Sequence, residues 1–106
     1  MAMYDEISAG AVLHIIDENF EIKYLILNYS YGHWDFPKGN IESGETEIET
    51  IKREVMEETG LQNVELIKPL LITYHTHEES GHHILKDSHW YLMKASSTQE
   101  LIPQIE

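Results

Sequence analysis

The chain has 106 residues, 42% of them hydrophobic, so we expect one folded domain over residues 1–106 with a single core. Seven basic and nineteen acidic residues give a formal net charge of −12, which argues against broad binding of nucleic acids or anionic membranes through bulk charge. The chain has no cysteine, no apolar run long enough to span a membrane and no basic-then-apolar leader at residues 1–8, so we expect a cytoplasmic protein.

Two strands are expected in the first third of the chain. Residues 7–16 mix small and β-branched side chains, which is typical of a buried strand, and Gly10 allows another segment to approach closely. His14 is interpreted as a packed strand residue. A turn signal at residues 17–19 predicts that residues 21–29 form a second strand paired with the first as a hairpin.

Residues 30–38 interrupt this pattern and are expected to form a loop that carries candidate binding residues. His33 is a candidate hydrogen-bond donor to a ligand or a cap of the loop. Trp34 could stack on a base or belong to the core. Lys38 is either a cation aimed at an anionic ligand or a solvated lysine beside a turn.

A helix is expected from about Thr46 to Gly60. Thr46 and Glu49 have the spacing of a capping box, in which each residue bonds to the backbone of the other. Gly60 follows the last periodic residues and suits the left-handed conformation that ends many helices.

The predicted helix places three carboxylates beside its buried face. At about 100° per residue, one stripe is apolar and the next is acidic: Ile48, Ile51 and Val55 form the first, and Glu54, Glu57 and Glu58 form the second. Like charges at this spacing repel one another, so we expect a cation between them. Mg²⁺ prefers such oxygen ligands, and the alternative is a solvated acidic face.

Extended structure is expected in the last third of the chain. Residues 63–77 read as extended structure interrupted by Pro69, and residues 84–95 read as another strand after a turn at residues 78–83. Five histidines fall in this part, which indicates either a transition-metal site or a polar hairpin with histidines facing solvent. They are His75, His77, His82, His83 and His89.

The segment 39–61 carries a recognisable order of residue types. Its fixed positions are Gly39, Glu45, Arg53, Glu54, Glu57, Glu58 and Gly60, with apolar residues at Val55 and Leu61. This order agrees with the Nudix box, G-x5-E-x7-R-E-U-x-E-E-x-G-U, where U is a bulky apolar residue. The chain therefore resembles Nudix hydrolases, and the preceding run HWDFPKG resembles the diadenosine tetraphosphate hydrolase branch.

The resemblance implies an α+β fold, a Nudix-type α/β/α sandwich with a mixed sheet. Residues 96–106 leave no room for the C-terminal strand and helix usual in the family, so we expect a domain that lacks them. An exposed apolar sheet face would favour self-association, which makes a homodimer an expectation. Many members of the family also use a glutamate after the final strand as a metal ligand or base. In this chain only Glu100 and Glu106 are nearby candidates for that residue.

The resemblance also implies an enzyme that hydrolyses phosphoric anhydride bonds with Mg²⁺ or Mn²⁺. By matching positions, Glu57 and Glu58 are the main metal ligands and Glu54 is a further ligand or the base. A backbone carbonyl of Lys38 or Gly39 would complete the shell. The catalytic set is expected to be Glu54, Glu57, Arg53 and Glu45, with Arg53 orienting its partners, commonly Glu45.

The expected substrate is a dinucleoside polyphosphate such as diadenosine tetraphosphate. Lys86 precedes Trp90 and Tyr91 in an arrangement similar to the lysine-plus-aromatic strand of that branch, although strand packing explains the aromatics equally well. The substrate-binding set is expected to be Lys38, His33, Lys86, Trp34 and Tyr74. The alternatives are a nucleoside triphosphate, an RNA 5′ end or a diphosphoinositol phosphate as substrate, or a silent Nudix domain that senses a nucleotide.

Overall fold

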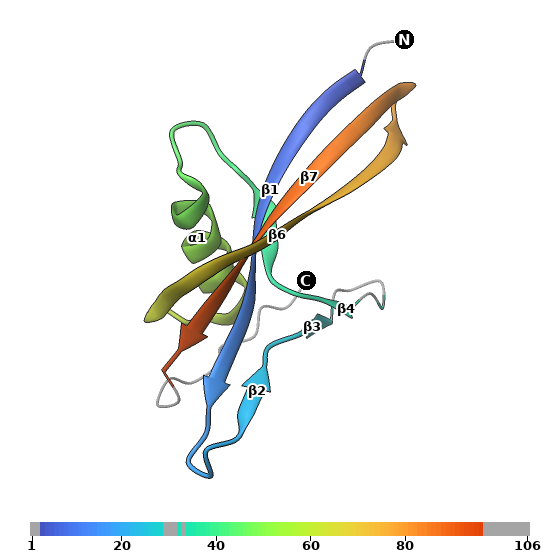
Figure 1. The fold of residues 1–106 in the computed structure, drawn as a ribbon. Helices are drawn as coiled ribbons and strands as arrows, with labels where there is room; N and C mark the ends of the chain where they lie inside the picture. Colours follow the sequence, from blue (N-terminus) through green and yellow to red (C-terminus); the bar gives the residue numbers. More distant parts are fainter. Residues whose placement is uncertain (1–2, 29–31, 33, 97–106) are drawn as a thin grey trace.

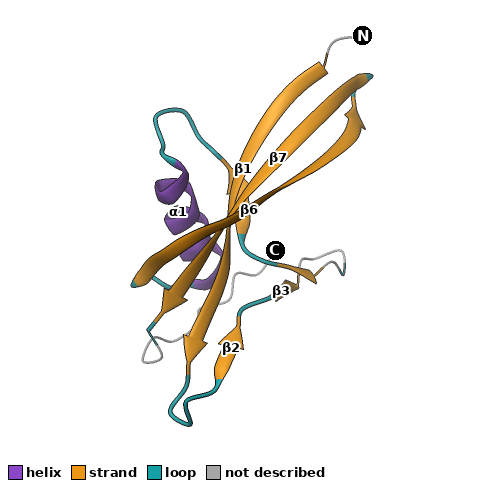
Figure 2. Ribbon diagram, viewed as in Figure 1, coloured by secondary structure: helices purple, strands orange, loops and turns teal. Residues whose placement is uncertain are grey.

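The computed structural model describes residues 3–28, 32 and 34–96 and shows a mixed sheet with one helix beside it (Figure 1, Figure 2). The central strand is β1 (Met3–Ile16), which pairs in parallel along most of its length with β7 (His82–Ala95). The edge strand β6 (Val64–Glu79) pairs antiparallel with β7. The expected α+β class with a mixed sheet is confirmed, while residues 97–106 lie outside the described residues.

The other side of β1 holds two short strands. β2 (Ile22–Tyr24) pairs antiparallel with the end of β1, which confirms the predicted hairpin, and β5 (Lys38–Asn40) pairs with its middle. The second strand is shorter than the predicted range 21–29. The Leu25 amide still donates to the Leu13 carbonyl, but the chain then leaves the sheet.

A separate two-stranded sheet joins the end of the predicted second strand to part of the predicted loop. β3 (Leu27–Asn28) pairs antiparallel with β4 (Trp34–Asp35). The prediction of a loop over residues 30–38 is therefore wrong at residues 34–35 and at residue 38, which belong to the paired strands β4 and β5.

β6 is one continuous strand through Pro69, but its pairing with β7 is irregular there, so the predicted interruption holds for the pairing and not for the strand. Proline removes one backbone donor, which an edge strand tolerates because one of its sides has no partner. The register with β7 shifts between Leu66 and Lys68 and again between Pro69 and Ile72. The turn is tighter than predicted, because only Ser80 and Gly81 separate the paired Glu79 and His82, and both have positive φ as in a two-residue hairpin turn.

The helix α1 (Glu47–Thr59) has the predicted ends. Thr46 caps it, the Glu49 amide donates to the Thr46 hydroxyl at 3.2 Å, and the Thr46 amide donates to the Glu49 carboxylate at 3.0 Å. Gly60 ends the helix with φ of 80°, and its amide donates to the Met56 carbonyl at 2.8 Å. These local bonds fix the first and last residues of the helix that carries the acidic stripe.

The core lies between α1 and the sheet. Ile51 and Val55 of α1 are fully buried, and Ile48 packs against them, as the apolar stripe predicts. They contact small and apolar residues of the strands and the residues after the helix: Ala9, Ala11, Leu13, Leu61, Val64, Met93 and Ala95. Within the part of the chain that the structure describes, no helix is long and apolar enough to cross a membrane.

The edge strand β6 exposes much of its apolar surface. Several large aliphatic side chains on it are more than a third exposed: Leu66, Ile67, Leu70, Leu71 and Ile72. This surface agrees with the reasoning behind the expected homodimer, and the homodimer itself stays a prediction.

Candidate active site

The backbone of Gly39 lies directly against the carboxyl group of Glu54. Gly39 is the middle residue of β5 and pairs with the buried Ala9 of β1, which faces α1. A Cβ atom on Gly39 would overlap the Glu54 carboxyl group. Glycine is therefore needed here for the close approach between strand and helix.

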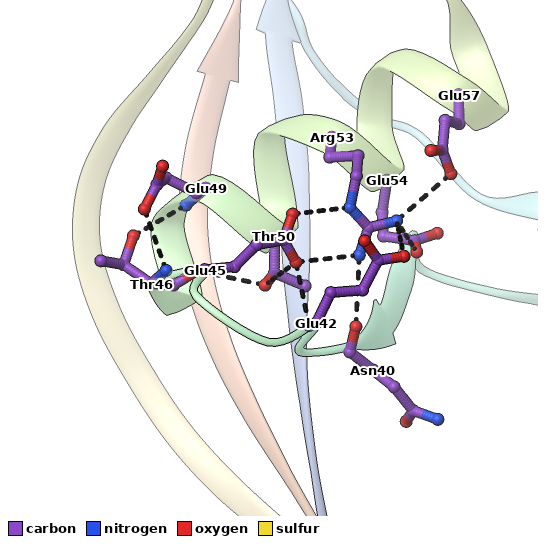
Figure 3. A network of polar contacts seen from close by, with 9 residues as sticks. All are labelled: Asn40, Glu42, Glu45, Thr46, Glu49, Thr50, Arg53, Glu54 and Glu57. Atoms are coloured by element: carbon purple, nitrogen blue, oxygen red, sulfur yellow. Dashed lines mark hydrogen bonds and ion pairs between the residues drawn. The ribbon is translucent and has the colours of Figure 1, made fainter.

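Arg53 joins the loop to the helix through a network of carboxylates (Figure 3). Its Nε donates to Glu45 Oε2 at 2.7 Å and its Nη2 donates to Glu45 Oε1 at 3.1 Å, which makes a bidentate pair. Its Nη1 donates to Glu54 Oε1 at 2.7 Å and lies 3.4 Å from Glu57 Oε2. Nη2 also donates to the Asn40 carbonyl at 3.2 Å, so Arg53 fixes the loop and two of the predicted metal ligands together.

Glu45 is held in place by three kinds of donor. Besides Arg53, the Glu42 amide donates to Glu45 Oε1 at 3.0 Å and the Thr50 hydroxyl donates to the same oxygen at 2.8 Å. The Arg53 guanidinium, followed by the Glu42 amide, lowers the pKa of the Glu45 carboxyl from 4.5 to about 2. The same contact with Glu45 raises the pKa of Arg53 above its ordinary value. Both groups are therefore charged at neutral pH.

Glu45 is expected to make the free energy of unfolding depend on pH in the acid range. Because its pKa in the folded state lies below the ordinary 4.5, its contribution is complete above pH 4.5 and is lost as the pH falls toward 2. Urea unfolding of the wild type and Glu45→Gln between about pH 5 and about pH 2 measures this dependence. We expect a shallower pH dependence for the variant.

Glu65→Gln is the matched control for this prediction, because Glu65 is an exposed glutamate of β6 away from Arg53. It should keep the pH dependence of the wild type. An identical slope for Glu45→Gln and the wild type would contradict the assigned role of the Arg53–Glu45 pair.

The site carries more negative charge than Arg53 offsets. Four carboxylates lie within 3.5 Å of the guanidinium, those of Glu42, Glu45, Glu54 and Glu57. One guanidinium offsets one of these four negative charges, so three remain. Glu58 lies one helical turn beyond Glu54, which adds to the same stripe. This excess of hard oxygen donors beside the Gly39 backbone fits a divalent cation such as Mg²⁺.

Lys38 lies on the other face of the sheet from Glu54. A Cβ on its partner Gly10 would meet Lys38 Cβ and the Trp90 ring, whereas a Cβ on Gly39 would meet Glu54. The Lys38 ammonium pairs with Asp35 at 3.2 Å and lies 5.8 Å from the Trp90 ring centroid. The structure therefore does not bring this side chain into the Arg53 network, and its contact with substrate stays a prediction.

Lys86 shares the face that Lys38 and Trp90 occupy. Alternate residues of a strand point to the same side, and Lys86 precedes Trp90 by four positions on β7. The Trp90 indole donates to the Thr73 hydroxyl at 2.9 Å, and Phe36 packs edge-on against its ring. Two lysines and an aromatic ring of the expected substrate site thus lie on one face.

The remaining expected binding residues are spread over the surface. Trp34 is 63% exposed on β4, so the alternative that it belongs to the core is wrong. Tyr74 is also 63% exposed and lines a groove of about 480 Å³ with Pro69, His89, Trp90 and others. His33 lies outside the described residues.

Sequence reasoning missed the contacts that tie α1 to β7. The Tyr91 hydroxyl donates to Glu47 Oε1 at 2.9 Å, and His89 Nδ1 lies 2.8 Å from the same oxygen. Burial, followed by Glu47, raises the pKa of Tyr91. The presence of an aromatic residue at position 91 is thus explained by its packing against α1. Because these contacts join residues more than forty positions apart, no local spacing in the sequence signals them.

Four of the five histidines fall into separate places on the sheet. His89 faces α1 through Glu47, whereas His83 pairs with Glu78 at 3.6 Å on the β6–β7 hairpin. His75 and His77 stack on each other, with ring centroids 6.1 Å apart. The expectation of solvent-facing histidines is therefore wrong for His89, whose side chain is 23% exposed.

Comparison with known proteins agrees with the box and the fold. A family model described as the NUDIX domain matches residues 8–106. The crystal structure of Caenorhabditis elegans Ap4A hydrolase superposes with a TM-score of 0.70 at 24% identity, covering 93% of this chain and 74% of that chain. At that identity the likeness concerns the fold.

Two curated relatives match over shorter segments. Bis(5'-nucleosyl)-tetraphosphatase [asymmetrical] of Rattus norvegicus is 44% identical over 52 residues, which is 47% of this chain and 35% of the relative. RNA pyrophosphohydrolase of Helicobacter pylori (strain G27) is 44% identical over 36 residues, which is 34% of this chain and 23% of the relative. The matched segments thus span about a third of these relatives or less.

Proposed function

The chain belongs to the Nudix family. We propose that it is a Mg²⁺-dependent pyrophosphohydrolase that cleaves a dinucleoside polyphosphate such as diadenosine tetraphosphate. The single observation that carries the proposal is the Arg53 network. One guanidinium orders the carboxylates of Glu45, Glu54 and Glu57 beside the Gly39 backbone and leaves excess negative charge there. The likeness to the rat tetraphosphatase supports the choice of substrate.

In this proposal the residues of the network have two different roles. Glu57, Glu58 and Glu54 offer carboxylate oxygens to the cation, and Glu54 is alternatively the base that takes a proton from water. Arg53 and Glu45 are positioning residues, because Arg53 holds Glu54 at 2.7 Å while Glu45 fixes the guanidinium from the loop. A divalent ion, when bound, would offset the charge of the substrate diphosphate and lower the pKa of the attacking water.

In this proposal Lys38 and Lys86, which share a face with Trp90 on the other side of the sheet from Glu54, bind the rest of the substrate. Two ammonium groups there would attract phosphates in a chain whose formal net charge is −12. The exposed Trp34 and Tyr74 offer aromatic surfaces on which a base could stack. A cytoplasmic location is part of the same proposal.

Gly39→Ala is expected to lower activity without unfolding the protein. The added methyl group displaces the Glu54 carboxyl group and weakens its bond to Arg53, so the free energy of unfolding should fall modestly while the protein stays folded. A ligand moved by about 1 Å costs on the order of 10- to 100-fold in rate. Steady-state kinetics at varied Mg²⁺, with urea unfolding alongside, measures both effects.

Ser43→Ala is the control for Gly39→Ala, because Ser43 is exposed in the same loop. Its activity should equal that of the wild type. Wild-type kinetics and Mg²⁺ dependence in Gly39→Ala would contradict the proposed contact between Gly39 and a metal-binding Glu54.

A second candidate substrate is the triphosphorylated 5′ end of RNA. The likeness to the Helicobacter pylori RNA pyrophosphohydrolase favours it, while the charge of −12 weighs against a long nucleic-acid contact. Nucleoside triphosphates and diphosphoinositol phosphates need the same diphosphate chemistry and belong in the same assay.

The experiment that tests the proposed function is a product analysis with a panel of these substrates and Mg²⁺ or Mn²⁺. We expect ATP and AMP from diadenosine tetraphosphate, at a higher kcat/KM than for any other substrate. Pyrophosphate from triphosphorylated RNA as the preferred reaction would select the second candidate. Nucleotide binding without turnover, unchanged in Glu57→Gln, would overturn the enzyme proposal in favour of a sensor.

A further inference from the structure

A second group of metal-binding side chains lies where the β6–β7 hairpin turns back beside the start of β1, beyond the part of the sheet that α1 accompanies (Figure 1). It consists of Glu6 on β1 and of His77 and Glu79 on β6. One ligand atom of each residue lies within 4.8 Å of the others. None of the three belongs to α1 or to the loop before it.

The register of three neighbouring strands brings these residues to one face. Glu6 pairs with Lys86 of β7, which pairs in turn with His75 of β6. Because alternate residues of a strand share a face, His77 and Glu79 follow His75 on the side where Glu6 lies. The turn after Glu79 has only two residues and Glu79 is still paired with His82, so the sheet itself sets the spacing of the group.

We propose that Glu6, His77 and Glu79 bind a divalent transition-metal ion of the Zn²⁺ or Ni²⁺ type. Such ions form bonds of about 2.0 to 2.2 Å to imidazole nitrogen and carboxylate oxygen, so their ligand atoms lie roughly 3 to 3.5 Å apart. His77 Nε2 already lies 3.5 Å from Glu79 Oε2. Both side chains are well exposed, at 41% and 65%, so small rotations would close the remaining distance.

The donor set separates this site from the carboxylates of α1. Glu54, Glu57 and Glu58 offer only oxygen, which suits Mg²⁺, whereas an imidazole nitrogen favours Zn²⁺, Ni²⁺ or Cu²⁺. Two carboxylates beside His77 also attract a cation. The ring of His75 lies beside that of His77, with centroids 6.1 Å apart and 27° between the planes.

Calorimetric titration of the full chain with ZnCl₂ in excess Mg²⁺ tests the proposal, because Mg²⁺ occupies oxygen-only sites. We expect one tight Zn²⁺ equivalent for the wild type. His77→Ala and Glu79→Gln should each weaken it by at least about 10-fold, since each removes a direct ligand. Circular dichroism checks that the variants, which change exposed side chains, keep their fold.

His83→Ala is the matched control. His83 lies on the same hairpin, is 42% exposed and faces a single carboxylate, Glu78, at 3.6 Å, but it belongs to no group of three ligands among the described residues. This variant should bind Zn²⁺ as the wild type does. No tight Zn²⁺ binding by the wild type, or equal weakening in His83→Ala and His77→Ala, would overturn the proposed site.

Co²⁺ gives an independent readout, because its visible absorption reports the ligands and geometry of the site. We expect d–d bands in the wild type and His83→Ala and their loss in His77→Ala. Bands that persist in His77→Ala and disappear in Glu57→Gln would assign the bound ion to α1 and overturn the proposal. The result does not depend on the hydrolase activity proposed above.

Discussion

Replacing Arg53 with alanine is expected to lower both kcat and Tm. The variant leaves Glu45, Glu54 and Glu57 without the guanidinium that lies between them, so the carboxylates repel one another and separate. Misplaced ligands should lower kcat on the order of 100-fold. The loss of several charge-assisted hydrogen bonds should lower Tm by several degrees. Steady-state kinetics and thermal unfolding measure the two effects.

Arg53→Lys separates the charge of Arg53 from its geometry. Lysine keeps the positive charge but cannot make the bidentate contact with Glu45 while also reaching Glu54. We expect Tm to recover more than kcat does, with a higher Mg²⁺ concentration needed for half-maximal activity. If Arg53→Ala had the kcat and Mg²⁺ dependence of the wild type, Arg53 would not be a positioning residue.

Glu57→Gln is expected to have the largest effect on activity of any substitution in α1. Glu57 is 54% exposed and touches Arg53 only at 3.4 Å, so its loss should change the free energy of unfolding little. As a direct ligand its charge should matter greatly, and we expect kcat to fall on the order of 100- to 1,000-fold. The measurement is initial-rate kinetics over a range of Mg²⁺ concentrations.

Glu49→Gln is the matched control for this substitution. Glu49 is an exposed glutamate of the same helix, and its side chain bonds to the Thr46 amide rather than to Arg53. Glutamine can keep that bond, so both activity and stability should remain close to the wild type. A loss of activity in Glu49→Gln as large as in Glu57→Gln would point to a general charge effect and against a ligand role for Glu57.

The ends of α1 could be predicted because they depend on local bonds. Thr46 with Glu49 and the left-handed Gly60 leave a signature within a few residues, and the structure has both. The spacing of Ile51 and Val55 likewise predicted the buried face of the helix. The acidic stripe follows from the same spacing, so its place beside the core was visible in the sequence.

Contacts between distant segments could not be predicted in this way. Spacing does not reveal that β1 and β7, which lie more than sixty residues apart in the sequence, are parallel neighbours. Nor does it reveal that the Lys38 side chain points away from Glu54, because that depends on the register of β5 with β1. Glu6 joins His77 and Glu79 for the same reason, through the order of three strands.

The central claim is that the carboxylates ordered by Arg53 hold the divalent cation. Backbone amide NMR spectra with substoichiometric Mn²⁺ test it most directly, since the paramagnetic ion broadens signals of nearby amides. We predict the strongest broadening at residues 39–40 and 54–58, and its loss there in Glu57→Gln. Sharp signals at these positions, with broadening elsewhere in the chain, would contradict the claim.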